Sequence, residues 1–525
     1  MKNTHRWHTF VVGIWTGFSR VLGLVRDMLM TYFFGISLFQ SAFAVAFTIP
    51  NLFRRLFGEG ALSASFVPAF SSALTKEGKA EAEKMGRRVL MLLMVFLTTL
   101  VVAGIGITYI IGWLAEGNAK ITTPLPFLRI MFPYAIFICM AAQCMGMLTA
   151  LKDFRTAAFS PAILNLVWIA VLLGVCPFIT GEERRIIAVS CGVTVAGVLQ
   201  FSLQWRRLRR MGWFKGVATP PSPSRNITAL WRDSKVAAVW KNAIPAAIGA
   251  GVVQINVCMD FALAMWANPW APATLKFAEH LVYLPLGLVS TAMGTVLLPA
   301  FSRQFAENDT EGMKLSLSEA MKDIALIMIP ATVGLVILAH PITALLYERG
   351  AFTELATLRT ARALAVYAPG LVVFSLQKII TPLFYGMHDM RTPMRLSVIT
   401  VVINAAFNVT FILTLPSEWK HVGIAASTVL CTLGLSVALC AIAQRRIGAL
   451  PWRPILSVTG KAVLAAAAMG AAAHFTYHAA AQALPRLAAL SLAIALALLL
   501  YAALLSLLYP GGARHLLALL RRRKR

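Results

Sequence analysis

The chain has few charged residues and a marked shortage of acids. Of its 525 residues only 13% are charged, and 21 Asp and Glu stand against 48 Lys and Arg. The mean hydropathy of +0.73 lies far above that of soluble globular domains. So few charges cannot cover the surface of a soluble protein of this length. The composition therefore indicates a polytopic membrane protein.

Cysteine pairs and catalytic motifs are lacking as well. The seven cysteines form no CxxC pair, and we interpret them as small apolar residues rather than as disulfides or metal ligands. No Walker motif, HExxH, GxSxG in a strand-to-helix setting or pair of loop carboxylates typical of catalysis is found. We expect no enzyme activity and no cofactor. Without an ATP-binding module, any transport must use an ion gradient or the membrane potential.

Long apolar runs dominate instead. Runs of about 20 residues predict fourteen transmembrane helices, because only helices satisfy the backbone within each such span. The first run is long and charged and is followed by no small-residue cleavage pattern, so we do not interpret it as a signal peptide. The predicted spans lie near residues 10–34, 38–57, 89–113, 127–150, 158–178, 186–204, 242–267, 277–301, 324–346, 360–386, 394–414, 422–443, 456–480 and 487–509.

Basic residues gather in every second connection between these spans. With the N-terminus inside, most Lys and Arg fall on the inner side, including the groups within 76–88, 206–241 and 514–525. The positive-inside rule then places both termini in the cytoplasm. The tail "RRRKR" is expected to bind anionic lipid headgroups, so the net charge of +27 does not indicate nucleic acid.

Two short motifs recur at nearly the same separation. "FVPAFS" at 66–71 returns as "LLPAFS" at 297–302, and "KDFRT" at 152–156 returns as "HDMRT" at 388–392. This predicts two pseudo-symmetric lobes of six helices in parallel orientation, as in many transporters. The predicted organisation is a first lobe at 1–204, a basic cytoplasmic linker at 205–241, a second lobe at 242–446, and two further helices with a basic tail at 447–525.

Charged residues inside the first span are costly and therefore candidates for function. At about 100° per residue, Ser19, Arg20, Gly23, Arg26 and Asp27 fall within an arc of roughly 120° on one helix face. Gly23 leaves room for a backbone or a ligand to come close. The alternative is a salt bridge of the first helix with a neighbouring helix.

The second span adds further cations. Pro50 can kink the helix, and Arg54 and Arg55 follow one turn later. We assign Arg54 to a cavity and Arg55 to the membrane surface. Glu59 either balances an arginine or pins a bend. The surplus of arginine over acid predicts an anionic ligand, and guanidinium geometry favours phosphate.

The second half has a different polar set. Asp260, Asn404, Asn408 and Thr428 could offer oxygen ligands to a hard monovalent cation such as sodium. The alternative is hydrogen bonding between helices by the asparagines. His280 could add positive charge at low pH or serve as an ordinary hydrogen-bonding residue.

Taken together, "FSRVLGLVRD", "IPNLFRRLFGEGALSASFVPAFS", "GTVLLPAFS" and the DxRT turns resemble the MurJ (MviN) lipid II flippase family of the multidrug/oligosaccharidyl-lipid/polysaccharide exporter superfamily. The resemblance implies two six-helix lobes around a cationic cavity, with the two added helices forming a groove for an undecaprenyl tail. It implies alternating access in the bacterial inner membrane. The implied substrate is lipid II, an undecaprenyl pyrophosphate bearing a disaccharide-pentapeptide used in peptidoglycan synthesis. We expect a monomer that contacts membrane lipids and cell-wall synthesis proteins.

The resemblance assigns site residues position by position. Ser19, Arg20, Arg26 and Asp27 match the family's first-span cavity residues, and Arg54 its second-span arginine; Gly23, Pro50 and the turn around Glu59 are expected bending points. Asp260, Asn404 and Asn408 fall where some members bind sodium, although an acid is common at the position of Asn408.

Two positions depart from the family pattern. Ser41 stands where an Asp is usual and His280 where an arginine is usual, so Lys276, one turn earlier, is a candidate replacement for that arginine. Two other functions stay open. One is a flippase for another undecaprenyl-linked oligosaccharide, such as an O-antigen unit, and the other is a membrane scaffold that transports nothing.

Overall fold

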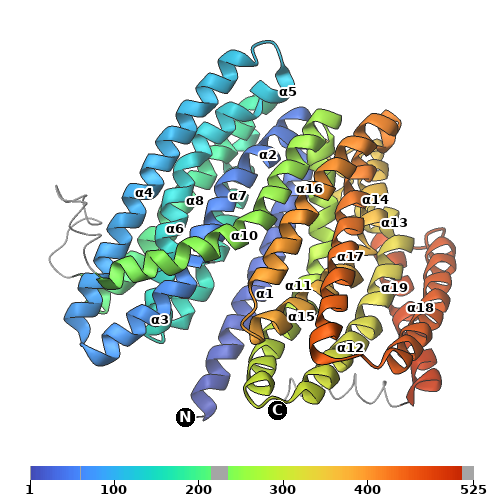
Figure 1. Cartoon of the computed structure of the whole chain (residues 1–525). Helices are drawn as coiled ribbons and strands as arrows, with labels where there is room; N and C mark the ends of the chain where they lie inside the picture. Colours follow the sequence, from blue (N-terminus) through green and yellow to red (C-terminus); the bar gives the residue numbers. More distant parts are fainter. Residues whose placement is uncertain (1, 59–60, 215–233, 511–525) are drawn as a thin grey trace. The chain divides into compact units, whose positions relative to one another are not determined.

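Helices make up all the regular structure of the described chain. The computed structural model describes residues 2–58, 61–214 and 234–510, and every regular element in these ranges is a helix (Figure 1). The chain divides into two compact units, Met1–Pro272 and Ala273–Arg525, each described by itself. The all-α fold expected from the apolar runs is confirmed.

The first unit is built from long helices and a few short turns. Its elements are α1 (Lys2–Phe34), α2 (Leu38–Phe53), the π-helical turn η1 (Arg54–Gly58), α3 (Ala61–Lys76), α4 (Lys79–Leu114), α5 (Ala119–Thr122), α6 (Pro124–Ala150), α7 (Phe154–Gly174), the 3-10 turn η2 (Cys176–Phe178), α8 (Glu182–Arg210) and α10 (Ser234–Ala267). Helix α6 forms the centre of this unit and packs against α8, α2 and α4. Helix α8 can approach α6 closely because residue 197 is glycine. A Cβ added there would lie 2.7 Å from Tyr134 Cδ2 of α6.

The second unit begins inside α11. Its elements are α11 (Ala271–Ala306), α12 (Thr310–Ile337), α13 (Ala339–Tyr347), α14 (Glu354–Tyr367), α15 (Gly370–Gly386), α16 (Arg391–Thr414), the 3-10 turn η3 (Ser417–Trp419), α17 (Lys420–Ile447), α18 (Trp452–Ala480) and α19 (Arg486–Leu508). Helix α12 packs against both α15 and α18. It therefore joins the helices of the predicted second lobe to the two added helices.

Two predicted spans are interrupted. The run at 324–346 is divided at Leu338 into α12 and α13, and the run at 360–386 consists of α14 and α15, which are bent by 43°. A proline lies close to each break, Pro341 in the first turn of α13 and Pro369 before α15. Proline lacks the N–H that a continuing helix needs, so both breaks have a local cause.

The number of membrane spans is supported in part. Among the described residues, nine helices are long and apolar enough to cross a membrane, or ten if α14 and α15 form one span. Outside this set are the predicted spans at 10–34, 38–57, 242–267 and 277–301, although each lies in helical structure. The total of fourteen stays a prediction.

Helix α10 packs differently from what the repeat suggests. The repeat places 242–267 at the start of the second lobe, yet α10 packs against α2 and α3 and belongs to the first compact unit. The unit defined by packing thus ends one helix later than the predicted lobe. The division into lobes at 242 stays a prediction based on the sequence repeat.

Small residues let the last two helices pack tightly. Ala462, Ala465, Ala466 and Ala473 of α18 are buried in a cluster with Ala497 of α19 and Leu326 of α12. Tyr501 donates a hydrogen bond of 2.7 Å to the Leu326 carbonyl oxygen, which ties α19 to α12. Small residues bring helix backbones together in membranes, where packing rather than the hydrophobic effect drives helix association.

Candidate functional site

Three side chains hold the guanidinium group of Arg26. Its Nε and Nη2 donate to Asp27 Oδ1 at 2.9 and 2.7 Å, and its Nη1 donates to Asn165 Oδ1 at 3.0 Å. The guanidinium carbon also lies 4.6 Å from the ring centroid of Trp168, a cation–π contact. Asp27 is only 3% exposed, and a buried carboxylate needs such a partner to stay charged. Asp27 therefore pairs with the adjacent arginine of its own helix.

The amide of Asn165 joins two levels of α1 to α7. Besides accepting from Arg26, its Nδ2 donates to the Ser19 carbonyl oxygen at 3.0 Å and lies 3.4 Å from Ser19 Oγ. Between these levels Gly23 is buried, and α1 and α7 pack along each other. Sequence reasoning missed Asn165 and Trp168. The signal that could have identified Asn165 is that an asparagine lies inside the apolar fifth span.

Arg26 keeps donors for a further partner. A guanidinium carries five N–H groups, and within the described chain three of them are used by Asp27 and Asn165. The side chain is 13% exposed. Arg20, on the same helix face, is half-buried. The first helix thus presents an oriented cation with hydrogen-bonding capacity left for an anion.

A π-helical turn follows Pro50 in the second span. Pro50 has no N–H to give to the preceding turn, and η1 begins four residues later. Side chains of α6 bind backbone oxygens around this turn: Cys139 Sγ lies 3.3 Å from the Phe53 oxygen, and Gln143 Nε2 donates to the Phe57 oxygen at 2.9 Å. Such π-turns are frequent at functional sites.

The two arginines of η1 have different surroundings. Arg54 is half-buried, and its Nε donates to Asn51 Oδ1 at 2.9 Å. Arg55 is exposed, and its Nη1 donates to Gln254 Oε1 of α10 at 3.1 Å. The contact of Arg55 with α10 was not foreseen. Glu59, the remaining charged residue of this motif, lies outside the described residues.

The candidate cation ligands are divided between the two units. Asp260 lies on α10 in the first unit and accepts from Asn256 Nδ2 at 3.2 Å. Asn404 and Asn408 lie on one buried face of α16 in the second unit. Asn408 Oδ1 accepts a hydrogen bond from Ser427 of α17, while Thr428 Oγ1 donates to the Ile424 oxygen at 3.1 Å. Asn408 thus takes part in hydrogen bonding between helices, with the Ser427 hydroxyl as a donor to its oxygen, and the cation site stays a prediction.

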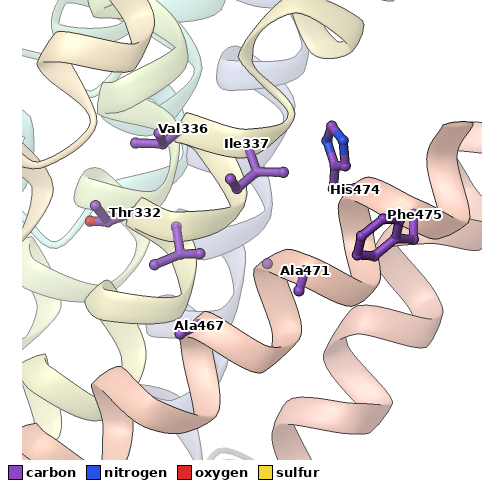
Figure 2. Close-up of a pocket in the computed structure, with 9 residues that line it drawn as sticks. Thr332, Val336, Ile337, Ala467, Ala471, His474 and Phe475 are labelled. Atoms are coloured by element: carbon purple, nitrogen blue, oxygen red, sulfur yellow. The ribbon is translucent and has the colours of Figure 1, made fainter.

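An apolar groove lies between α12 and α18. Its volume is about 660 Å³. Figure 2 shows the side chains along it, with His474 and Phe475 at one end and Thr332 on the α12 side. Helix α19 also packs against α18 but contributes none of the residues that line this groove. The lining residues are Thr332, Val333, Val336, Ile337, Ala467, Gly470, Ala471, His474 and Phe475.

Comparison with known proteins assigns the family. A family model described as lipid II flippase MurJ matches residues 30–495, most of the chain. The chain belongs to the MurJ lipid II flippase family. A probable lipid II flippase MurJ of Rhizobium meliloti is 32% identical over 472 residues, which cover 86% of this chain and 83% of that protein. Lipid II flippase MurJ of Burkholderia cenocepacia is 32% identical over 399 residues, covering 75% and 76%.

Solved structures of two transporters share the fold. A lipid II flippase MurJ in an inward closed conformation matches with a TM-score of 0.75 and 24% identity over 95% of this chain and 99% of that one. An inward-facing MATE family transporter of the MOP superfamily matches with a TM-score of 0.66 and 15% identity over 82% and 94%. These matches and the family model confirm the resemblance seen in the sequence. They also confirm the expectation of a transporter rather than an enzyme.

The positions that the sequence resemblance assigned to the site fall in both units. Ser19, Arg20, Arg26, Asp27 and Arg54 lie in the first unit, together with Ser41, which is fully buried in α2. Lys276 and His280 lie half-buried on α11 in the second unit. The role of each residue in binding stays a prediction.

Proposed function

We propose that this protein moves lipid II from the cytoplasmic to the outer leaflet of the bacterial inner membrane by alternating access, with both termini in the cytoplasm. Membership of the MurJ family supports the substrate, and the distribution of basic residues supports the orientation. The observation that carries the proposal is the oriented Arg26, a cation of the predicted first span with N–H donors left for an anion.

In this proposal the pyrophosphate of lipid II is the anion. Arg26 binds it with its remaining N–H donors, and Arg20 and Arg54 contribute further charge, since guanidinium groups bind phosphate oxygens with a matching fork geometry. Asp27 and Asn165 keep Arg26 in one orientation, so little conformational entropy is lost when the anion binds. By the family resemblance, Lys276 and His280 of α11 are further candidates for cationic or hydrogen-bonding groups.

The undecaprenyl tail needs a different surface. We assign it to the groove between α12 and α18, whose lining is apolar except for Thr332 and His474. An isoprenoid chain loses no hydrogen bonds in such a groove and can stay continuous with the lipid phase. The tail would then lie along α18 while the headgroup passes through the protein.

The membrane potential supplies a driving force. An inside-negative potential favours outward movement of an anionic headgroup by about 2.3 kcal/mol per charge per 100 mV. A sodium gradient is a second proposed source, with Asp260, Asn404, Asn408 and Thr428 as candidate ligand residues. Their oxygen atoms suit a hard cation, but Asn408 Oδ1 already accepts from Ser427. Sodium would have to share that oxygen, so we favour the potential.

Complementation tests the proposal directly. Cells depleted of their own lipid II flippase receive this protein, and growth and the accessibility of lipid II at the outer leaflet are measured. We expect the unmutated protein to restore both, and Arg26→Glu to restore neither although it is made and folded. The matched control is Arg55→Glu, which reverses an exposed charge next to the same site and is expected to retain most activity. An unmutated, folded protein that exposes no lipid II would refute the proposal.

A further inference from the structure

The connection from α6 to α7 in the first unit and that from α15 to α16 in the second have the same backbone hydrogen bonds. Lys152 after α6 and His388 after α15 both adopt the left-handed conformation, with φ of 63° and 59°. The next residue, Asp153 or Asp389, donates its backbone N–H to the oxygen five residues earlier, at 2.8 and 2.9 Å. Each connection is thus a Schellman motif, built with a non-glycine residue where glycine is usual. The "KDFRT" and "HDMRT" repeats are the same local structure.

In both copies the aspartate accepts hydrogen bonds from the first turn of the next helix. Asp153 Oδ1 accepts from the Thr156 backbone N–H at 3.4 Å and from its hydroxyl at 3.3 Å. Asp389 Oδ1 accepts from the Thr392 backbone N–H at 3.0 Å, and Asp389 Oδ2 accepts from the Thr392 hydroxyl at 2.6 Å. An aspartate in this position satisfies N–H groups that have no partner within the helix.

The same carboxylate also binds an arginine at the end of a third helix. Arg207, in the last turn of α8, donates through Nε to Asp153 Oδ2, and Arg446, in the last turn of α17, pairs with Asp389 Oδ2 at 2.6 Å. Arg446 also lies 5.6 Å from the ring centroid of Phe384. Asp153 therefore joins the end of α6, the start of α7 and the end of α8. Asp389 joins α15, α16 and α17 in the same way.

These carboxylates stay charged at neutral pH. Burial by itself raises the pKa of the Asp153 carboxyl, but the hydrogen bonds from Arg207 and Thr156 and the charge of Arg207 outweigh it, so the pKa lies below its ordinary value. The pKa of Asp389 is lowered in the same way by Thr392 and Arg446 against the opposing effect of burial. Each ion pair is thus intact over the physiological range.

We propose that the Asp153–Arg207 and Asp389–Arg446 pairs are matched clamps, which make α6–α7–α8 and α15–α16–α17 move as rigid bodies during transport. This inference rests on the proposed alternating-access function. The charge distribution predicts that these helix ends lie on the cytoplasmic side, where they must part from other helices when that side opens. The clamp keeps the three helices of a set together while the rest moves. The four residues are positioning residues, since no contact with substrate is required of them.

Substitutions can separate the ion pair from the helix cap. Asp389→Asn keeps an oxygen for the cap but removes the charge, whereas Asp389→Ala removes both. We expect Asp389→Asn and Arg446→Gln to slow exposure of lipid II about fivefold, with little change in the amount of folded protein. The matched control is Arg445→Gln, which removes an exposed arginine next to Arg446. Unchanged exposure rates in both clamp variants would overturn the proposal, as would equal slowing by the control.

Combinations test whether each pair acts as a unit. Asp389→Asn together with Arg446→Gln should be no slower than either change alone, because both break one interaction. Asp389→Asn together with Asp153→Asn should multiply the two defects, because the clamps lie in separate units. Multiplied defects within one pair would contradict the clamp.

A distance measurement makes failure of the clamp distinguishable from failure of the lipid II assignment. Spin labels are placed at Arg395→Cys on α16 and Arg445→Cys on α17, both exposed, after the seven native cysteines have been replaced. In lipid nanodiscs we expect one narrow distance distribution, and a broader one when Asp389→Asn is added. A distribution that Asp389→Asn leaves unchanged overturns the clamp whatever the substrate is. If the unmutated protein exposes no lipid II, the proposed function fails, yet this measurement still decides the clamp.

Discussion

Replacing Arg26 by lysine separates the orientation of its charge from the charge itself. The arginine makes three hydrogen bonds, two to Asp27 and one to Asn165, and lies 4.6 Å from the Trp168 ring centroid. A lysine ammonium is a compact point charge on a flexible stem and can reach Asp27 or Asn165, but not both with the fork geometry of arginine. The variant therefore keeps the charge and loses about two of the three hydrogen bonds.

The expected loss follows from these contacts. A hydrogen bond contributes about 1 kcal/mol net, so two of them amount to about 2 kcal/mol. If that energy orients Arg26 for the transition state of transport, the rate falls roughly 30-fold, since about 1.4 kcal/mol is a factor of ten. Arg26→Gln, which also loses the charge, should be slower still.

The assay is the initial rate of lipid II exposure at the outer leaflet in depleted cells, normalised to the folded protein in the membrane. Arg55→Lys is the matched control, because Arg55 is exposed and donates one hydrogen bond, to Gln254. A rate for Arg26→Lys within about threefold of the unmutated protein, with Arg26→Gln inactive, would refute the orientation argument, because charge alone would then suffice.

Three further predictions concern other parts of the fold. Gln143→Leu removes the hydrogen bond to the Phe57 oxygen at the π-turn, so the melting temperature should fall by the equivalent of about 1 to 2 kcal/mol; an unchanged value would show that the turn does not need this bond. Gly470→Ala places a Cβ 2.6 Å from Val333 Cγ1 and forces α18 away from α12, so the free energy of unfolding in a denaturation experiment should fall by about 1 to 3 kcal/mol. An unchanged free energy of unfolding would show that Val333 can move aside without cost. Because the pKa of Asp389 is lowered in the folded state, its stabilising effect is complete above the ordinary Asp pKa and lost as the pH falls through the folded value. The melting temperature of Asp389→Asn should accordingly depend less on pH below about 5 than that of the unmutated protein, and parallel curves would contradict this.

The sequence was most informative where a local property decides the structure. Apolar runs predicted the long helices because a membrane span must be both apolar and helical. The run at 158–178 corresponds to α7 (Phe154–Gly174), with its start displaced by the Asp153 cap. The run at 324–346 was predicted as one helix although Pro341 lies inside it. Pro341, a residue that interrupts helices, was visible in the sequence, but the prediction of one continuous helix relied on hydropathy alone.

Partners far apart in the chain could not be predicted from a single sequence. The helical projection placed Ser19, Arg26 and Asp27 on one face of α1, but it could not supply Asn165, which lies 139 residues beyond Arg26. Packing of α10 on α2 and α3 was likewise unforeseen, because a hydropathy pattern says which residues avoid water and not which helix covers them. The family resemblance assigned Arg26 to a cavity but gave no reason for its orientation. That reason is the set of hydrogen bonds that Arg26 donates to Asp27 on α1 and to Asn165 on α7.

The double contact of Asn165 restricts how the first helix can be displaced. Arg26 is seven residues after Ser19, about two helical turns or 10 Å further along α1. The Arg26 side chain and the Ser19 carbonyl oxygen nevertheless both form hydrogen bonds with the Asn165 amide. Sliding α1 along α7 by the rise of one residue, about 1.5 Å, would break both bonds, and turning it by one residue, about 100°, would carry the Arg26 side chain off the amide. The Asn165 amide therefore opposes both translation of α1 along α7 and rotation of α1 about its own axis. Helix α1 can therefore change position only by bending beyond this point or by carrying α7 with it.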